Sequence, residues 1–167
     1  VISHEYLKSK NVKSYGLKQL NGSLIVPVIS ATSGEVRSLQ YIDKNGQKRF
    51  VSASEIKGNI FLIGCEHNTL ATQESLMIVE GYSTAATVFE STKIPTVCVF
   101  SANFTLDAVS KLRTITQARL YIALDNDENG VGERKAKEVA SAIPNTFVRI
   151  PSARGDYNDL ARAHGLD

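Results

Sequence analysis

Apolar and polar positions follow two different rhythms along this chain. Up to about residue 63, apolar residues form short runs at 24–29 and 60–63 and alternate with polar ones at 36–42. Such runs and period-two alternation are typical of β-strands. Asn45-Gly46 follows the alternating stretch, and this pair readily adopts the positive φ angles of a tight hairpin. We therefore predict that residues 36–42 turn back and pair antiparallel with 48–51.

Beyond residue 70 the pattern alternates between apolar runs and helical spacing. Four runs rich in apolar residues are predicted strands: 76–79, 96–100, 120–124 and 146–150. Between and after them apolar residues recur at helical spacing, which predicts helices at 84–91, 106–115, 133–143 and from 160. Ser83 or Thr84 is expected to cap the first of these helices. This alternation predicts right-handed strand–helix–strand units and an α/β fold, with a parallel sheet covered by helices on both faces.

The change of rhythm divides the chain into two parts. We predict a small basic α+β subdomain with antiparallel strands over 1–70 and an α/β domain over 71–167. Residues 1–60 carry nine Lys/Arg against four Asp/Glu, whereas 61–167 carry ten against thirteen. A basic part beside clustered acids suits a polyanion-binding, metal-using enzyme, although a short chain can also show such a split by chance.

Composition excludes several classes of protein. No apolar run approaches the roughly 20 residues that cross a bilayer. Two cysteines, Cys65 and Cys98, are too few for a disulfide framework or a four-cysteine zinc site. We therefore expect a cytoplasmic location. Because the first residue is Val1 rather than Met, we also expect a piece of a longer protein.

Acidic residues follow three of the four predicted parallel strands. Glu80 follows the first strand, Asp125 and Asp127 follow the third, and Asp156 and Asp159 follow the fourth. Ligands of open α/β sheets bind at the carboxyl ends of the strands. Several carboxylates placed together are unfavourable unless a cation lies among them, and an all-oxygen set suits Mg²⁺ or Mn²⁺. The sequence therefore predicts a divalent-cation site at this edge.

This ordered set resembles a known family. Glu80-Gly81, Asp125-Asn126-Asp127 with Gly130, and the acidic turn at 156–159 are similar to the Toprim domain over roughly residues 74–165. The preceding segment resembles the small N-terminal subdomain of bacterial-type primase catalytic cores, above all those of plasmid- and phage-encoded primases. The resemblance implies a Rossmann-like parallel sheet of about four strands with flanking helices.

The resemblance also implies an activity and roles for the acids. It implies a DNA primase, which makes short oligonucleotide primers on single-stranded DNA by metal-dependent transfer of nucleoside triphosphates. Glu80 then matches the family's acid/base or metal-contacting glutamate, and Asp125 and Asp127 match its metal-binding Asp-x-Asp. Asp156 and Asp159 match later acidic positions. Zinc-binding and helicase modules are expected elsewhere in the longer protein.

Basic residues of the first part are candidates for contact with nucleic acid. Lys48 matches a basic family position linked to template or nucleotide binding, and Lys44, Arg49 and Lys57 lie nearby in the sequence. Arg154, beside the acidic turn, is a candidate for contact with a triphosphate. Each could instead be an ordinary solvent-facing charge.

Other interpretations of the acids stay open. Asp125 and Asp127 could simply cap a helix. The run from Asp125 to Gly130 matches the first half of a calcium-binding EF-hand loop, but position twelve is Ala136 rather than an acid. A phosphatase of the haloacid dehalogenase type also uses Asp-x-Asp after a strand, although near the start of its domain.

Within the Toprim fold, the alternatives to a primase are an OLD-like nuclease and a non-catalytic RecR-like nucleic-acid-binding module. Thr84 also departs from chromosomal primases, which carry an acid there.

Overall fold

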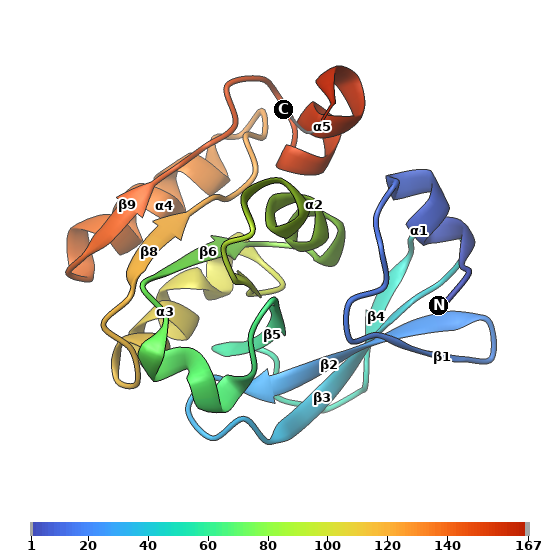
Figure 1. Cartoon of the computed structure of the whole chain (residues 1–167), viewed down its shortest axis with the longest axis horizontal. Helices are drawn as coiled ribbons and strands as arrows, with labels where there is room; N and C mark the ends of the chain where they lie inside the picture. The colour runs from blue at the N-terminus through green and yellow to red at the C-terminus, as the bar shows by residue number, and fades with distance from the viewer. Residues whose placement is uncertain (1, 166–167) are drawn as a thin grey trace.

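The structure is a computed structural model that describes residues 2–165, and Figure 1 shows its arrangement. Its strands are β1 (Lys18–Leu20), β2 (Ser23–Ser30), β3 (Val36–Ile42), β4 (Lys48–Phe50), β5 (Asn59–Ile63), β6 (Ser75–Val79), β7 (Thr96–Cys98), β8 (Arg119–Ile122) and β9 (Thr146–Val148). Its α-helices are α1 (Glu5–Lys10), α2 (Tyr82–Thr92), α3 (Thr105–Arg113), α4 (Val131–Ala142) and α5 (Tyr157–His164). Two 3-10 helices cover His67–Thr72 and Ala102–Phe104.

The strands form one sheet that joins an antiparallel part to a parallel part. Its order is β4-β3-β2-β5-β7-β6-β8-β9, with β1 paired to β2. β6, β7, β8 and β9 are mutually parallel, whereas β2 to β5 pair antiparallel. The two parts meet where β5 pairs antiparallel with β7. The mixed α/β fold is confirmed, and the division at residue 70 stays a prediction because the sheet runs across it.

Helices cover both faces of the parallel part, as the alternation predicts. α3 and α4 bury Ala108, Val109, Ala136 and Val139 in one core cluster, with β6 and β8 side chains. α2 packs Ala85 and Ala86 into a second cluster on the other face, which also takes Tyr6 and Leu7 of α1. α5 packs against α2 near the carboxyl ends of β8 and β9 (Figure 1). None of the helices within residues 2–165 has the length and apolarity that a membrane crossing requires.

Local differences from the sequence prediction concern element ends. α2 begins at Tyr82 with Gly81 as its N-cap, so the predicted cap at Ser83 or Thr84 is wrong. Both side chains are buried within the first turn, where they pack instead of capping. β1 was not predicted, because its residues Lys18–Leu20 are all exposed and carry no apolar alternation.

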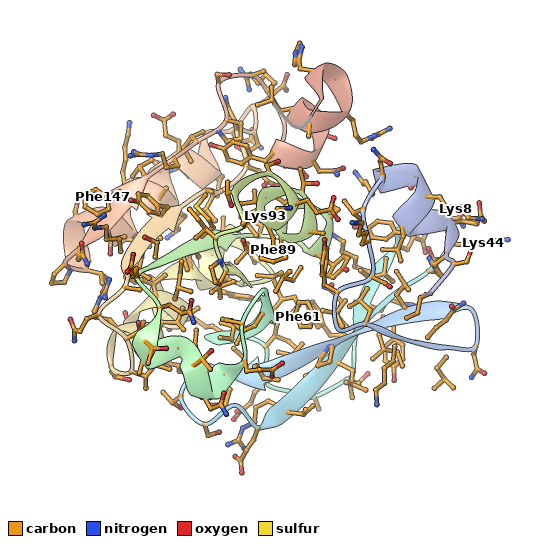
Figure 2. The ribbon with its side chains drawn as sticks, viewed as in Figure 1. Lys8, Lys44, Phe61, Phe89, Lys93 and Phe147 are labelled. Carbon is orange, nitrogen blue, oxygen red and sulfur yellow. The ribbon has the colours of Figure 1, made fainter. Side chains whose placement is uncertain are left out.

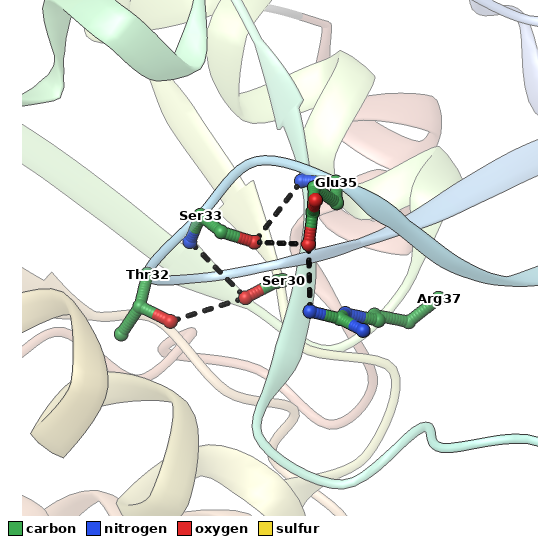
Figure 3. Close-up of polar contacts among 5 residues, drawn as sticks. All are labelled: Ser30, Thr32, Ser33, Glu35 and Arg37. Carbon is green, nitrogen blue, oxygen red and sulfur yellow. Dashed lines mark hydrogen bonds and ion pairs between the residues drawn. The ribbon is translucent and has the colours of Figure 1, made fainter.

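Polar side chains fix the connection from β2 to β3 (Figure 3). Ser30 Oγ accepts a hydrogen bond from the backbone N–H of Ser33 and lies 3.1 Å from Thr32 Oγ1. Arg37 donates to Glu35 at 2.7 Å, and Ser33 Oγ donates to the same carboxylate. The turn satisfies its own polar groups, which is the expected role of Ser and Thr in such loops. We assign these five residues to structure.

Candidate metal and nucleotide site

Two adjacent strands place the first two acids. β6 and β8 are neighbours, with Ile78 opposite Ile122, and Ala123 N–H donates to the Ile78 carbonyl at 2.7 Å. Glu80 and Asp125 follow these positions by two or three residues. The predicted convergence at the carboxyl edge of the sheet therefore brings Glu80 and Asp125 near each other.

Asp125 is the electrostatic centre of the site. Burial is the largest cause that raises its pKa to about 8; the negative charges of Glu80 and Asp156 also raise it, whereas Lys48 acts in the opposite direction. Its Oδ1 atom is buried and has no hydrogen-bond partner among the described residues. A buried polar atom without a partner is costly and calls for an explanation. A cation bound beside these carboxylates would supply one.

The remaining acids line a pocket of about 320 Å³ together with Asp125. Asp127, Asp156 and Asp159 border it, and so does Arg154. Asp127 Oδ1 accepts the Val131 N–H at the start of α4 at 3.0 Å. Asp156 and Asp159 form a capping box at the start of α5, each accepting the other's backbone N–H. The capping interpretation thus holds for Asp127, whereas no such bond is made by Asp125 Oδ1. Asp127, Asp156 and Asp159 each have a second carboxyl oxygen that caps nothing.

Asn126 ties the acidic turn at 156–159 to the segment of Asp125 and Asp127, a role that the sequence does not predict. Its backbone pairs with that of Gly155 in both directions, at 2.9 and 3.0 Å. Its side-chain amide donates to the carbonyls of Pro151 and Ala153. These four bonds hold the loop before Asp156 against the end of β8. No sequence signal points to this role, because the acceptors are backbone carbonyls that only the fold brings close.

Lys48 comes to the acids from the antiparallel part of the sheet. A Cβ atom added to Gly81 would lie 3.2 Å from Lys48 Nζ, so the ammonium group lies beside the residue that follows Glu80. Its charge lowers the pKa of Asp125, which places it within electrostatic range of that carboxyl group. The basic position suggested by the family resemblance therefore lies at the site.

The other basic candidates have different surroundings. Arg154 is exposed and borders the acidic pocket. Arg49 is exposed on β4 opposite Tyr41. Lys44 lies in the exposed turn between β3 and β4 and extends outward at the edge of the molecule (Figure 2). Lys57 forms an ion pair with Asp107 of α3 at 3.3 Å. The structure thus brings Lys48 and Arg154 to the acids, and it does not bring Lys57 there.

The carboxylate side chains at this site are of the chemical type that binds a hard divalent cation. Within residues 2–165 no three His, Cys, Asp or Glu side chains stand in an arrangement that would already hold a metal ion. Yet Glu80 and Asp156 are close enough to Asp125 to raise its pKa, and Asp125 Oδ1 has no partner. Carboxylate oxygens are the ligands that Mg²⁺ and Mn²⁺ take in proteins. Glu80, Asp125 and Asp156 are the residues that would hold the ion.

Comparison with known proteins agrees with this geometry. The Toprim domain model matches residues 75–167, more than half of the chain, and the chain belongs to the Toprim family. Within that family it is similar to DNA primase TraC of Escherichia coli, with 32% identity over 149 residues. That match covers 83% of this chain but only 14% of the length of TraC.

Solved structures show the same fold in primases. The crystal structure of the primase fragment of the bacteriophage T7 primase-helicase protein matches with a TM-score of 0.65 at 18% identity, covering 98% of this chain and 66% of that one. The RNA polymerase domain of Mycobacterium tuberculosis primase DnaG matches with a TM-score of 0.64 at 16% identity, covering 99% and 60%. The Toprim resemblance is confirmed, and the antiparallel part shares the fold of primase cores.

Proposed function

We propose that this chain is the catalytic core of a DNA primase, which joins nucleoside triphosphates into short primers on a single-stranded DNA template. The observation that carries the proposal is the environment of Asp125. Its Oδ1 atom is buried without a hydrogen-bond partner among the described residues. The charges of Glu80, Asp156 and Lys48 lie close enough to shift its pKa. The similarity to TraC and the shared fold of primase cores support it. A bound Mg²⁺ or Mn²⁺ would neutralise phosphate charge and polarise a phosphoryl oxygen.

In this proposal acidic side chains bind the ion, and basic side chains bind the triphosphate and the template. Glu80, Asp125 and Asp156 hold the ion, with Asp127 and Asp159 at the rim of the same pocket. Glu80 also accepts the proton of the attacking 3′-hydroxyl, whose oxygen bonds to the α-phosphorus of the incoming nucleotide while the α–β phosphoanhydride bond breaks and pyrophosphate leaves. Lys48 and Arg154 bring positive charge to the triphosphate, since oriented cations stabilise the charge of phosphoryl transfer. Lys44, Arg49 and Lys57 contact the template backbone, and Lys57 exchanges its exposed pairing with Asp107 for a phosphate.

The wider setting is part of the proposal. Zinc-binding and helicase modules in the full-length protein would present the template, and the protein would act in the cytoplasm on plasmid or phage DNA. The bacteriophage T7 relative is a primase-helicase by its name. The chain spans about a seventh of the length of TraC, so most of such a protein lies outside it.

A primer-synthesis assay tests the proposal. The chain is incubated with single-stranded DNA, labelled nucleoside triphosphates and Mg²⁺ or Mn²⁺. We expect oligonucleotide products, and a loss of about 100-fold or more in Asp125→Ala because a bound ion contributes several kcal/mol. Lys48→Met should lower the rate by about tenfold or more, as charged hydrogen bonds contribute roughly 1.5–3 kcal/mol.

One control variant and two alternative outcomes make the assay decisive. Lys18→Met removes an exposed basic residue of β1 that has no assigned role, and it should keep the wild-type rate. Degradation of the DNA in place of synthesis would indicate a nuclease. Binding without any synthesis, under conditions that load the ion, would indicate a non-catalytic module, and either result would contradict the proposal.

A further inference from the structure

The sheet surface beyond α2 carries aromatic rings and arginines side by side. Tyr121 of β8 and Phe147 of β9 are register partners, and their ring centroids lie 5.7 Å apart with the planes tilted by 33°. The guanidinium carbon of Arg149 lies 5.3 Å from the Tyr121 centroid. Arg119 precedes Tyr121 by two positions, and side chains two apart in a strand share a face. We call these four residues the β8–β9 platform.

The platform is open to solvent and positively charged. Phe147 is 42% exposed, which is unusual for a phenylalanine, and it projects at the outer edge of the sheet (Figure 2). Arg119 and Arg149 are exposed, and neither takes part in an ion pair among residues 2–165. Burial in the core therefore does not account for the placement of these side chains.

A groove continues the platform between α2 and α5. It has a volume of about 700 Å³, and Tyr121 and Arg149 form part of its wall beside Met77, Ile94 and Leu160. None of the described residues that line it carries a carboxylate. The platform and the groove together present apolar and aromatic faces with cationic groups and no counter-charge. Their chemistry suits a flexible polyanion that also carries flat apolar rings.

Single-stranded nucleic acid combines these two features. Its bases stack on exposed aromatic rings, and its phosphates pair with arginines. An acidic peptide would satisfy the arginines but would leave Phe147 without a planar partner. We infer that the β8–β9 platform binds single-stranded nucleic acid, with a base stacked on Phe147 and phosphates against Arg149 and Arg119.

The platform adds a second contact surface to the one assigned above. The proposed function places the template along the first part of the chain, whereas the platform lies on strands of the Toprim domain. Tyr121 precedes Asp125 by four residues on one extended segment, or about 13 Å at 3.3 Å per residue. The platform is therefore separated from the acidic site by at most about 13 Å of backbone. The inference concerns binding alone and does not depend on catalysis.

A fluorescence titration tests the inference directly. The chain contains no tryptophan, so Phe147→Trp introduces a single reporter at the platform. Titration with a twelve-nucleotide oligo(dT) should quench its emission, because the base stacks on the indole, and added salt should weaken the binding. An emission that does not respond to the oligonucleotide overturns the inference. A response to poly-glutamate but not to oligo(dT) also overturns it, in favour of a protein partner.

Affinity measurements on matched variants complete the test. Phe147→Ala should weaken oligo(dT) binding by roughly 5- to 150-fold, the effect of losing one stacked base. Val36→Ala removes a comparably exposed apolar side chain from β3 and should leave the affinity unchanged. Equal affinities of Phe147→Ala and the wild type, with matching thermal unfolding, would overturn the inference.

The result of the quenching test is independent of the result of the primer-synthesis assay. Asp125→Asn in the Phe147→Trp background should keep the quenching even where primer synthesis is lost. A chain that makes no primers but shows the quenching contradicts only the proposed function. A chain that makes primers without the quenching contradicts only the platform.

Discussion

Among single residues, Asp125 determines the character of the proposed site. It is a carboxyl group with one oxygen buried and unpartnered, close to two further acids and to the ammonium group of Lys48. Burial, and after it the like charges of its neighbours, disfavour its ionised form, which is why its pKa rises to about 8 from the ordinary value of 3.8. An arrangement that costs stability in the free chain is typical of a binding site.

The raised pKa of Asp125 makes stability depend on pH. Between about pH 4 and pH 8 Asp125 is protonated in the folded chain and ionised in the unfolded chain, so its contribution to stability falls as pH rises through this window. Asp125→Asn removes that titration, so in EDTA the variant should gain more stability over the wild type at pH 8 than at pH 5. Thermal unfolding at the two pH values measures this.

The matched control is Glu128→Gln, an exposed acid of the same pocket. It should follow the wild-type dependence on pH. Parallel profiles for Asp125→Asn and the wild type would show that Asp125 is an ordinary surface carboxylate, and the electrostatic description of the site would be wrong.

At the scale of elements, the start of α4 is pressed against the end of β8. A Cβ atom at Gly132 would overlap the backbone oxygen of Asp125, so only glycine permits this approach. Gly130, two residues earlier, faces open space but has a φ angle of +63°. The two glycines therefore serve different needs, one steric and one conformational.

Alanine at each glycine should separate these needs. Gly132→Ala forces α4 away from Asp125, so we expect a loss of about 2 kcal/mol or more together with weaker Mn²⁺ binding. Gly130→Ala should cost about 1 kcal/mol for the left-handed backbone and keep Mn²⁺ binding. Chemical denaturation and a Mn²⁺ titration measure both effects. Equal losses of Mn²⁺ affinity in the two variants would contradict the steric role of Gly132.

The sequence predicts those elements whose apolar pattern is unambiguous. The strands around 76–79 and 120–124 are continuous apolar runs, and the structure places both in the parallel sheet. The acids that follow these strands could be predicted to lie close together, because the carboxyl ends of parallel strands lie at one edge of the sheet. β1 escapes prediction because its exposed residues carry no apolar pattern. The hydrogen bonds of Asn126 and the ion pair of Lys57 with Asp107 could not be predicted either, since both join segments that are distant in sequence.

At the scale of the whole molecule, part-buried hydrogen bonds join the two parts of the chain. The buried Tyr82 hydroxyl donates to the Lys13 carbonyl at 2.6 Å and accepts the Tyr15 N–H at 2.7 Å. Asn158 of α5 donates to the Lys10 carbonyl. With the pairing of β5 and β7, these contacts fix the antiparallel part, and with it Lys48, relative to the acids. We expect the two parts to unfold together.

Two tyrosines test this coupling. Tyr82→Phe removes two part-buried hydrogen bonds, each contributing about 0.5–1.5 kcal/mol, so we expect one cooperative transition with a loss of about 1–3 kcal/mol. Tyr6→Phe removes a buried hydroxyl that has no partner among the described residues, so it should be neutral or stabilising. Urea unfolding followed by circular dichroism measures both. Two separate transitions in the wild type would contradict the coupling.

The most direct test of the central claim is a calorimetric titration of the chain with Mn²⁺ at pH 8. We expect uptake by the wild type, loss of uptake in Asp125→Asn, and retained uptake in Glu128→Gln. Uptake that survives Asp125→Asn, or no uptake by a folded wild-type chain, would contradict the claim that Asp125 and its acidic neighbours form a divalent-cation site.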